Sequence, residues 1–310
     1  MQLLTYPRYV KICEVAGRDG FQSEKDFIRT EDKTRIIDSL AETGVWKIEA
    51  TSFVHPKAVP QLRDAEEVMA GIKRRAGVIY TCLVPNIRGA QRALGCSVDE
   101  LNVVISASGT HNMKNVGMPV EKSLENLKEI VSLALNERVP VNGSVGTAFG
   151  CPFEGVISKD RTLGMVDRYL DMGVNSITLA DTTGMANPSQ VYELLTEFKA
   201  RWPKVPVALH FHNTRGMGLA NVLAGMQAGV DIYDASLGGL GGCPFAPGAT
   251  GNICTEDLVH MLHEMGIVTG IDLDMLIEVS RGLEAVVGRI LPGLVIKAGR
   301  TSCLHALYGG

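Results

Sequence analysis

Two histidines separated by one residue, His210 and His212, are the strongest candidates for chemistry in this sequence of 310 residues. Side chains alternate along a β-strand, so two imidazoles at this spacing point to one face and can share a cation. A metal needs further ligands, and Asp19 and Asn252 are the nearest candidates if the first and last strands are neighbours. Histidine, carboxylate and amide ligands without cysteine are typical of Mg2+ or Mn2+ sites. The alternative is that both histidines are structural.

Other polar residues with chemical potential also follow short apolar runs. Arg18 stands beside Asp19 after the first run, Glu49 ends the second, and Asp181 ends the sixth. In a barrel of parallel strands, side chains at the carboxyl ends of the strands face the active site. We therefore expect these residues to gather around the histidine pair.

A glycine-rich segment, residues 238–252, follows the last apolar run and contains Cys243. Glycine allows positive φ angles, so such a segment can fold over a ligand. A thiol near Arg18 and a cation could serve as an acid or base, because positive charge favours the thiolate. The alternative for Cys243 is an inert buried thiol. His260 and His263, three residues apart in an expected helix, are interpreted as a solvated helix face.

These residues need a scaffold, and the chain alternates short β-branched runs with amphipathic helical patterns. Continuous apolar runs are typical of parallel strands that are covered on both faces. Eight such alternations predict an α/β fold, a (β/α)8 TIM barrel over residues 1–270 with a C-terminal helical extension over 271–310. A doubly wound sheet is the alternative, but no nucleotide-binding glycine motif favours it. The expected strands are residues 10–15, 45–50, 78–84, 101–106, 139–147, 176–180, 205–211 and 231–237.

Composition excludes several classes of partner. The chain has 30 Lys and Arg against 34 Asp and Glu, a net charge of −4, and no long basic run. We therefore expect no nucleic acid and no membrane surface as partners. No apolar run is long enough to span a bilayer, and the first residues do not resemble a signal peptide. Seven scattered cysteines argue against a disulfide framework, so we expect a reduced, cytoplasmic compartment.

Four segments, in order along the chain, carry a family resemblance. They read EVAGRDGFQSE (14–24), IEATSFVHPKAVPQ (48–61), GCPFEG (150–155) and GGLGGCPFAPGATGNICTEDLVHML (238–262). On these motifs the chain resembles the 3-hydroxy-3-methylglutaryl-CoA (HMG-CoA) lyases of the DRE-TIM metallolyase superfamily over most of its length. The resemblance implies a metal-dependent retro-Claisen lyase that yields acetyl-CoA and acetoacetate, with an acyl-CoA substrate, a homodimeric assembly and a place in leucine degradation.

The resemblance also implies roles for individual residues. The metal ligands would be Asp19, His210, His212 and Asn252, and either Asp19 or His210 would be a candidate for the general base. Arg18 would stabilise the enolate oxygen, and Cys243 would protonate the acetyl-CoA carbanion. The two supporting acids of the site would be Glu49 and Asp181.

Departures from the family pattern leave the substrate open. The family segment HCHDTYG is His210-Phe-His-Asn-Thr-Arg-Gly216 here, so Asn213 and Arg215 replace an aspartate and a tyrosine. The residues proposed for chemistry are retained while their neighbours change. The sequence therefore supports the type of reaction more strongly than the identity of the acyl group. The alternatives are a lyase for citramalyl-CoA or a longer 3-hydroxyglutaryl-CoA, and a Claisen-type synthase of the same superfamily. A non-catalytic barrel is the third alternative.

Overall fold

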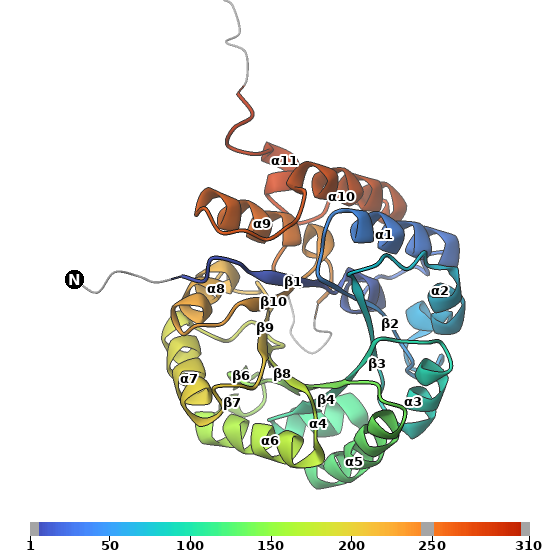
Figure 1. The fold of residues 1–310 in the computed structure, drawn as a ribbon, viewed down its shortest axis with the longest axis vertical. Coiled ribbons are helices and arrows are strands. Elements are labelled where there is room, and N and C mark those ends of the chain that lie inside the picture. Colours follow the sequence, from blue (N-terminus) through green and yellow to red (C-terminus); the bar gives the residue numbers. More distant parts are fainter. Residues whose placement is uncertain (1–5, 243–250, 305–310) are drawn as a thin grey trace, which may run out of the picture.

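The computed structural model describes residues 6–242 and 251–304, and these form a closed barrel of parallel strands surrounded by helices (Figure 1). The strands follow one another around the barrel in the order β1-β10-β9-β8-β5-β4-β3-β2. The predicted (β/α)8 barrel is therefore confirmed, and each expected strand overlaps one of the observed strands. The barrel strands are β1 (Lys11–Glu14), β2 (Lys47–Ser52), β3 (Ile79–Leu83), β4 (Glu100–Ser106), β5 (Val141–Gly146), β8 (Ser176–Asp181), β9 (Val207–Phe211) and β10 (Ile232–Ala235).

Helices cover the outside of the barrel, and their apolar faces pack on the strands. In α5, for example, residues at helical spacing such as Leu124, Leu127 and Val131 are buried. No helix in the described part of the chain is long and apolar enough to cross a membrane. The helices that follow barrel strands are α1 (Thr30–Glu42), α2 (Ala65–Gly71), α3 (Ile87–Leu94), α4 (Gly109–Val116), α5 (Val120–Asn136), α6 (Lys159–Met172), α7 (Pro188–Arg201), α8 (Gly218–Gln227) and α9 (Thr255–Glu264).

Short elements at the strand ends were not foreseen from the sequence. They include the hairpin of β6 (Gly150–Cys151) and β7 (Gly155–Val156), a π-helical turn η1 (Ala16–Gly20), and the 3-10 turns η2 (Pro60–Leu62) and η3 (Leu237–Gly239). The last strand ends at Ala235 rather than at 237, because the N–H of Ser236 donates to Ile253 and the N–H of Leu237 to the Glu14 side chain instead of to a neighbouring barrel strand.

The C-terminal segment forms α10 (Leu273–Val287) and α11 (Val295–Ala298), which lie outside the ring beside α1 and α9 (Figure 1). The carboxylate of Asp257 in α9 accepts backbone N–H groups from Leu294 and Val295 and so caps the start of α11. The helical extension expected after residue 271 is thus present, while its separation from the barrel as a unit stays a prediction.

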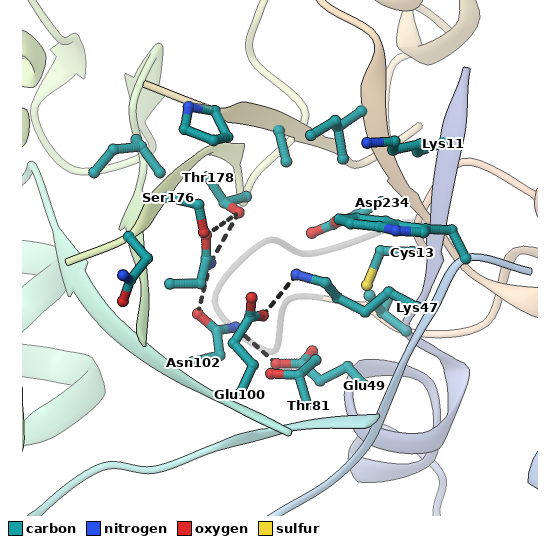
Figure 2. Close-up of a pocket in the computed structure, with 18 residues that line it drawn as sticks. Lys11, Cys13, Lys47, Glu49, Thr81, Glu100, Asn102, Ser176, Thr178 and Asp234 are labelled. Carbon is teal, nitrogen blue, oxygen red and sulfur yellow. Dashed lines mark hydrogen bonds and ion pairs between the residues drawn. The ribbon is translucent and has the colours of Figure 1, made fainter. Parts of the chain in front are cut away.

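The interior of the barrel is unusually polar. Most such barrels are filled with layers of branched apolar side chains. Here Lys47 donates to Glu100 at 2.6 Å inside the barrel, and both line a cavity of about 250 Å³ (Figure 2). The cavity is also lined by Glu49, Asn102 and Asp234, so acidic and amide side chains lie directly beneath the strand ends.

Glu14, fully buried in β1, ties this strand to the end of β10. Its carboxylate accepts the backbone N–H groups of Ala16 and Leu237 and the hydroxyl of Thr255. Burial raises the pKa of Glu14 to about 8 despite these hydrogen bonds, because the charged form is poorly solvated there. At pH values below about 8, Glu14 is therefore neutral, and in this form it holds the start of the glycine-rich segment.

Glu14→Gln should flatten the pH dependence of stability. The folded protein holds the Glu14 proton up to a pH of about 8, whereas an unfolded chain releases it near the ordinary pKa of 4.5. The free energy of unfolding should therefore fall as the pH rises between these values, and this loss should disappear in the variant. The measurement is Tm by circular dichroism from pH 5 to 8. Glu31→Gln, on the exposed side of α1, is the control, and parallel Tm curves for Glu14→Gln and wild type would contradict the assignment.

A pair of glycine substitutions tests the packing between barrel and helix. A Cβ at Gly143 in β5 would lie 2.8 Å from the Tyr169 ring of α6, whereas a Cβ at Gly164 in α6 would meet nothing within 4 Å. Gly143→Ala should cost about 1–3 kcal/mol through overpacking. Gly164→Ala should instead gain up to about 1 kcal/mol through helix propensity. Urea unfolding of both variants measures the difference, and an equal effect in both would refute this packing.

Candidate active site

The turn η1 places Arg18 and Asp19 at the carboxyl end of β1. It leaves the strand abruptly because Gly17 packs directly on β2, where an added Cβ would lie 2.7 Å from the carbonyl oxygen of Ala50. Only glycine permits this close approach of two backbones. The turn therefore fixes the two neighbouring charged side chains against the second strand.

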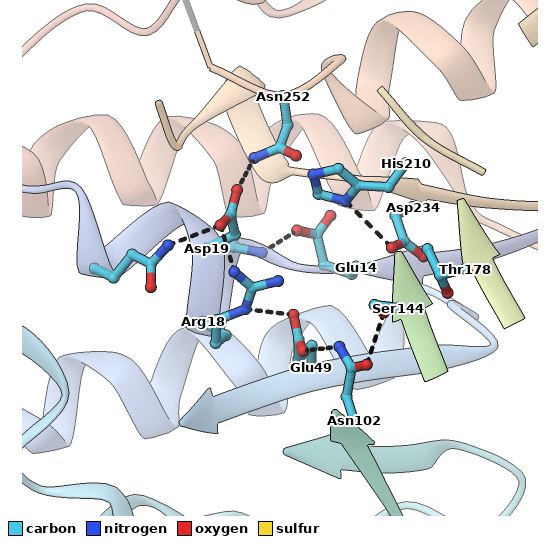
Figure 3. A network of polar contacts seen from close by, with 12 residues as sticks. Glu14, Arg18, Asp19, Glu49, Asn102, Ser144, Thr178, His210, Asp234 and Asn252 are labelled. Atoms are coloured by element: carbon cyan, nitrogen blue, oxygen red, sulfur yellow. Dashed lines mark hydrogen bonds and ion pairs between the residues drawn. The ribbon is translucent and has the colours of Figure 1, made fainter. Parts of the chain in front are cut away.

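Arg18 is held on two sides. Its Nε donates to Oε2 of Glu49 at 2.6 Å, and its Nη1 donates to Oδ1 of Asp19 at 2.5 Å (Figure 3). Glu49 in turn accepts a hydrogen bond from Nδ2 of Asn102 at 2.7 Å. With both carboxylates engaged, the guanidinium has a single orientation at the mouth of the barrel.

The two acids beside Arg18 differ in their electrostatics. Burial opposes the ionisation of Asp19, but Arg18 and His212 outweigh it and hold the pKa of Asp19 well below its usual range. Burial raises the pKa of Glu49, and its contacts with Arg18 and Asn102 only partly offset this. Asp19 is thus anionic at neutral pH and available as a ligand for a cation.

The histidine pair lies at the end of β9, as the alternation of a strand requires. The Nε2 atoms of His210 and His212 are 3.1 Å apart, and Nε2 of His212 lies 3.5 Å from Oδ2 of Asp19. One ligand atom from each of these three residues lies within 4.8 Å of the others, and all three are buried. The predicted convergence of the first and seventh strand ends is therefore present.

Asn252 reaches the same place from the far end of the glycine-rich segment. It forms an isolated β-bridge with His212, and its Nδ2 donates to Oδ2 of Asp19 at 2.7 Å. Close packing of this segment's two ends requires glycine, since a Cβ at Gly251 would lie 2.0 Å from the carbonyl oxygen of Gly241. Asn252 thus joins the three residues named above in one cluster.

The cluster has the chemical character of a metal site. Oδ1 of Asn252 is buried and has no hydrogen-bond partner among the described residues, which ordinarily costs about 1–3 kcal/mol. Two imidazole Nε2 atoms facing each other also force one of them to carry a proton toward the other. A divalent cation would accept electron pairs from the nitrogens and from the amide and carboxylate oxygens. These residues therefore fit the expected group.

The carboxylate of Asp181, a predicted site residue, is engaged elsewhere than in this cluster. Both oxygens of Asp181 accept backbone N–H groups, from Met185 and Ala186, so its carboxylate stabilises the turn after β8. Its link to the cluster runs through the backbone, because the N–H of His212 donates to its carbonyl oxygen. Cys243 lies outside the described residues. His263, on the outer helix α9, forms a hydrogen bond with Thr269, which follows that helix.

Sequence reasoning missed two residues that contact the site from below. Asp234 of β10 lies 3.2 Å from Nδ1 of His210, and Asn102 of β4 supports Glu49 (Figure 3). Each is an inward-facing polar side chain between two less polar neighbours in its expected strand. A buried polar residue inside an apolar strand was the available signal, because such a group needs a partner.

Comparisons with known proteins agree with this geometry. The sequence profile of the HMGL-like family matches residues 9–283. A hydroxymethylglutaryl-CoA lyase of Bacillus subtilis is 42% identical over 299 residues, which covers 96% of this chain and all of that protein. A cytoplasmic 3-hydroxy-3-methylglutaryl-CoA lyase of Danio rerio is 44% identical over 88% of this chain and 81% of its own length.

A solved structure is similar along nearly the whole chain. The HMG-CoA lyase of Acinetobacter baumannii, in complex with coenzyme A and 3-methylmalate, superposes with a TM-score of 0.93 at 49% identity. The match covers 97% of this chain and 98% of that one. A barrel of this topology, a cluster of metal-ligand character at its mouth and these similarities together place the chain in the HMGL-like family, to which it belongs.

Proposed function

We propose that the protein is a divalent-metal-dependent carbon–carbon lyase that cleaves HMG-CoA to acetyl-CoA and acetoacetate. The observation that carries the proposal is the convergence of Asp19, His210 and His212 beside the clamped Arg18, in a chain of this family. The similar proteins named above are HMG-CoA lyases, and one of them binds coenzyme A. An acyl-CoA is therefore the substrate class.

The metal ligands would be Asp19, His210, His212 and Asn252, with Mg2+ or Mn2+ as the ion. When bound, such an ion would supply Lewis-acid polarisation and orientation of the substrate's hydroxyl and carboxylate oxygens. Asp19 is anionic and lies between Arg18 and His212, so it can orient both neighbours. Removal of the hydroxyl proton falls to Asp19 or to one of the histidines.

Arg18 would stabilise the charge that develops when the bond between C2 and C3 breaks. The electron pair of that bond moves toward the thioester and leaves an enolate oxygen, which a fixed guanidinium favours. Glu49 holds the Arg18 side chain through Nε, and its own position is set by Asn102. The donor is thus positioned before the reaction, which lowers the reorganisation that charge development requires.

Cys243 would complete the reaction by protonating the carbanion of acetyl-CoA at C2. This role comes from the family motif GGLGGCP, since the residue lies outside the described part of the chain. The described ends of its segment support the assignment, because Gly241 and Gly251 pack against each other next to Asn252. Asp181 would contribute by holding the turn after β8 at the same rim.

A second candidate substrate is another branched 3-hydroxyacyl-CoA such as citramalyl-CoA. The relative from Acinetobacter baumannii binds 3-methylmalate, a branched hydroxydicarboxylate. In this chain Arg215 replaces the family's tyrosine, and its Nη1 donates to the carbonyl oxygens of Thr183 and Gly184 at the rim. We propose that this change affects which acyl group the site accepts. A homodimeric assembly, a cytoplasmic location and a place in leucine degradation stay predictions.

Purified protein should release acetyl-CoA and acetoacetate from HMG-CoA only when Mg2+ or Mn2+ is present. Arg18→Ala should lower kcat by about 10²–10³-fold at saturating metal, because it removes a charge-stabilising donor. Product formation is followed by coupled enzymatic assays, with a chelator as the metal-free control. Citramalyl-CoA and 3-methylmalyl-CoA are assayed in parallel. A metal-bound protein that is inactive on HMG-CoA and turns over one of these would reassign the substrate but retain the reaction.

Asp19→Asn should separate the role of ligand from that of base. If the carboxylate acts only as a ligand, the variant should bind Mn2+ more weakly and should recover kcat at saturating metal. If Asp19 also takes the hydroxyl proton, kcat should stay at least about 100-fold low at any metal concentration. Titration calorimetry gives the Kd for Mn2+, and initial rates give kcat. An unchanged Kd would contradict its place among the ligands.

A further inference from the structure

We infer that Asp234, at the floor of the site, is the positioning residue that directs His210 toward the metal. The inference rests on the proposed metal-dependent function and adds a residue to which no chemistry has been assigned. Asp234 would fix both the ring orientation and the tautomer of His210, so that Nε2 presents a lone pair to the cation.

The geometry of His210 separates its two ring nitrogens. Nδ1 lies 3.2 Å from Oδ2 of Asp234 (Figure 3). Nε2, the other ring nitrogen, lies 3.1 Å from Nε2 of His212. An ionised carboxylate can only accept, so Nδ1 must carry the proton of this hydrogen bond. In the neutral ring Nε2 is then the unprotonated nitrogen, and it faces the metal-ligand cluster.

The barrel itself brings the two residues together. Asp234 of β10 and His210 of β9 are direct partners in the parallel ladder, and both side chains point into the barrel. The Asp234 side chain is 14% exposed, and that of His210 is 8% exposed. A contact between adjacent strands in a closed sheet has little freedom to drift, so the carboxylate is well placed to hold the ring.

The charges of Lys47 and Arg18, which lie near Asp234, are already paired with other acids, and Lys11, which lines the same cavity, lies over the ring of Trp46. Lys47 binds Glu100 at 2.6 Å, and Arg18 binds Glu49 at 2.6 Å. Among the described residues, His210 is the side chain with which Asp234 forms its ion pair. A partly buried carboxylate that lines a cavity favours such a partner, because desolvation penalises an unpaired charge. Asp234 is thus paired with His210 and not with Lys47 of the cavity.

Metal affinity tests this role without relying on turnover. Wild type, Asp234→Asn, Asp234→Ala and the control Glu100→Gln are titrated with Mn2+, using electron paramagnetic resonance of free Mn2+, and their Tm values are recorded. Asn matches Asp in volume, so a loss in this variant cannot come from an empty space. Glu100→Gln removes a carboxylate from the same cavity without touching His210.

Asp234→Asn and Asp234→Ala should each raise the Kd for Mn2+ by about 10–100-fold, while Glu100→Gln should stay within about threefold of wild type. The asparagine variant should be no better than the alanine variant, because its amide N–H can donate to Nδ1 and leave Nε2 protonated. An Asp234→Asn Kd equal to that of wild type would overturn the inference, as would an equal loss in Glu100→Gln. A wild type that binds no Mn2+ would instead refute the proposed function.

Discussion

Closure of the barrel between β1 and β10 is the constraint on which the site depends. These strands lie at opposite ends of the sequence, yet they pair directly, with Glu14 opposite Ala235. Their pairing brings the turn with Arg18 and Asp19 beside the end of β9 and the segment that returns at Asn252. Without closure, Asp19 and His212 would belong to distant edges of an open sheet and could share no cation.

Closure also creates an electrostatic problem that the hydrogen-bond network solves. Carboxylates from η1, β2, β4 and β10 lie in and above the barrel interior, where an unpaired charge is poorly solvated. Each of four is matched to a particular donor: Asp19 and Glu49 to Arg18, Glu100 to Lys47, and Asp234 to His210. The same pairings orient the groups proposed for chemistry, so charge compensation and preorganisation are one arrangement.

The glycine-rich segment is anchored at its base by buried groups. Glu14 accepts the backbone of Leu237, and Glu256 accepts that of Gly238. Positive φ angles at Gly238, Gly239 and Gly241 then let the chain turn sharply over the site. The described ends of the segment are therefore held against each other beside Asn252 and Asp19.

Local pattern in the sequence predicted the eight barrel strands, the helices around them and the candidate ligands, but not the short elements at the strand ends. Period-two alternation put His210 and His212 on one face, and the family motifs pointed to Asp19 and Asn252. The partners of these residues depended on the tertiary structure. Asp234 meets His210 only because β10 pairs with β9 in a particular register, and Asn102 meets Glu49 across β3. Sequence periodicity determines which way a side chain points, whereas strand register and barrel closure decide what it meets.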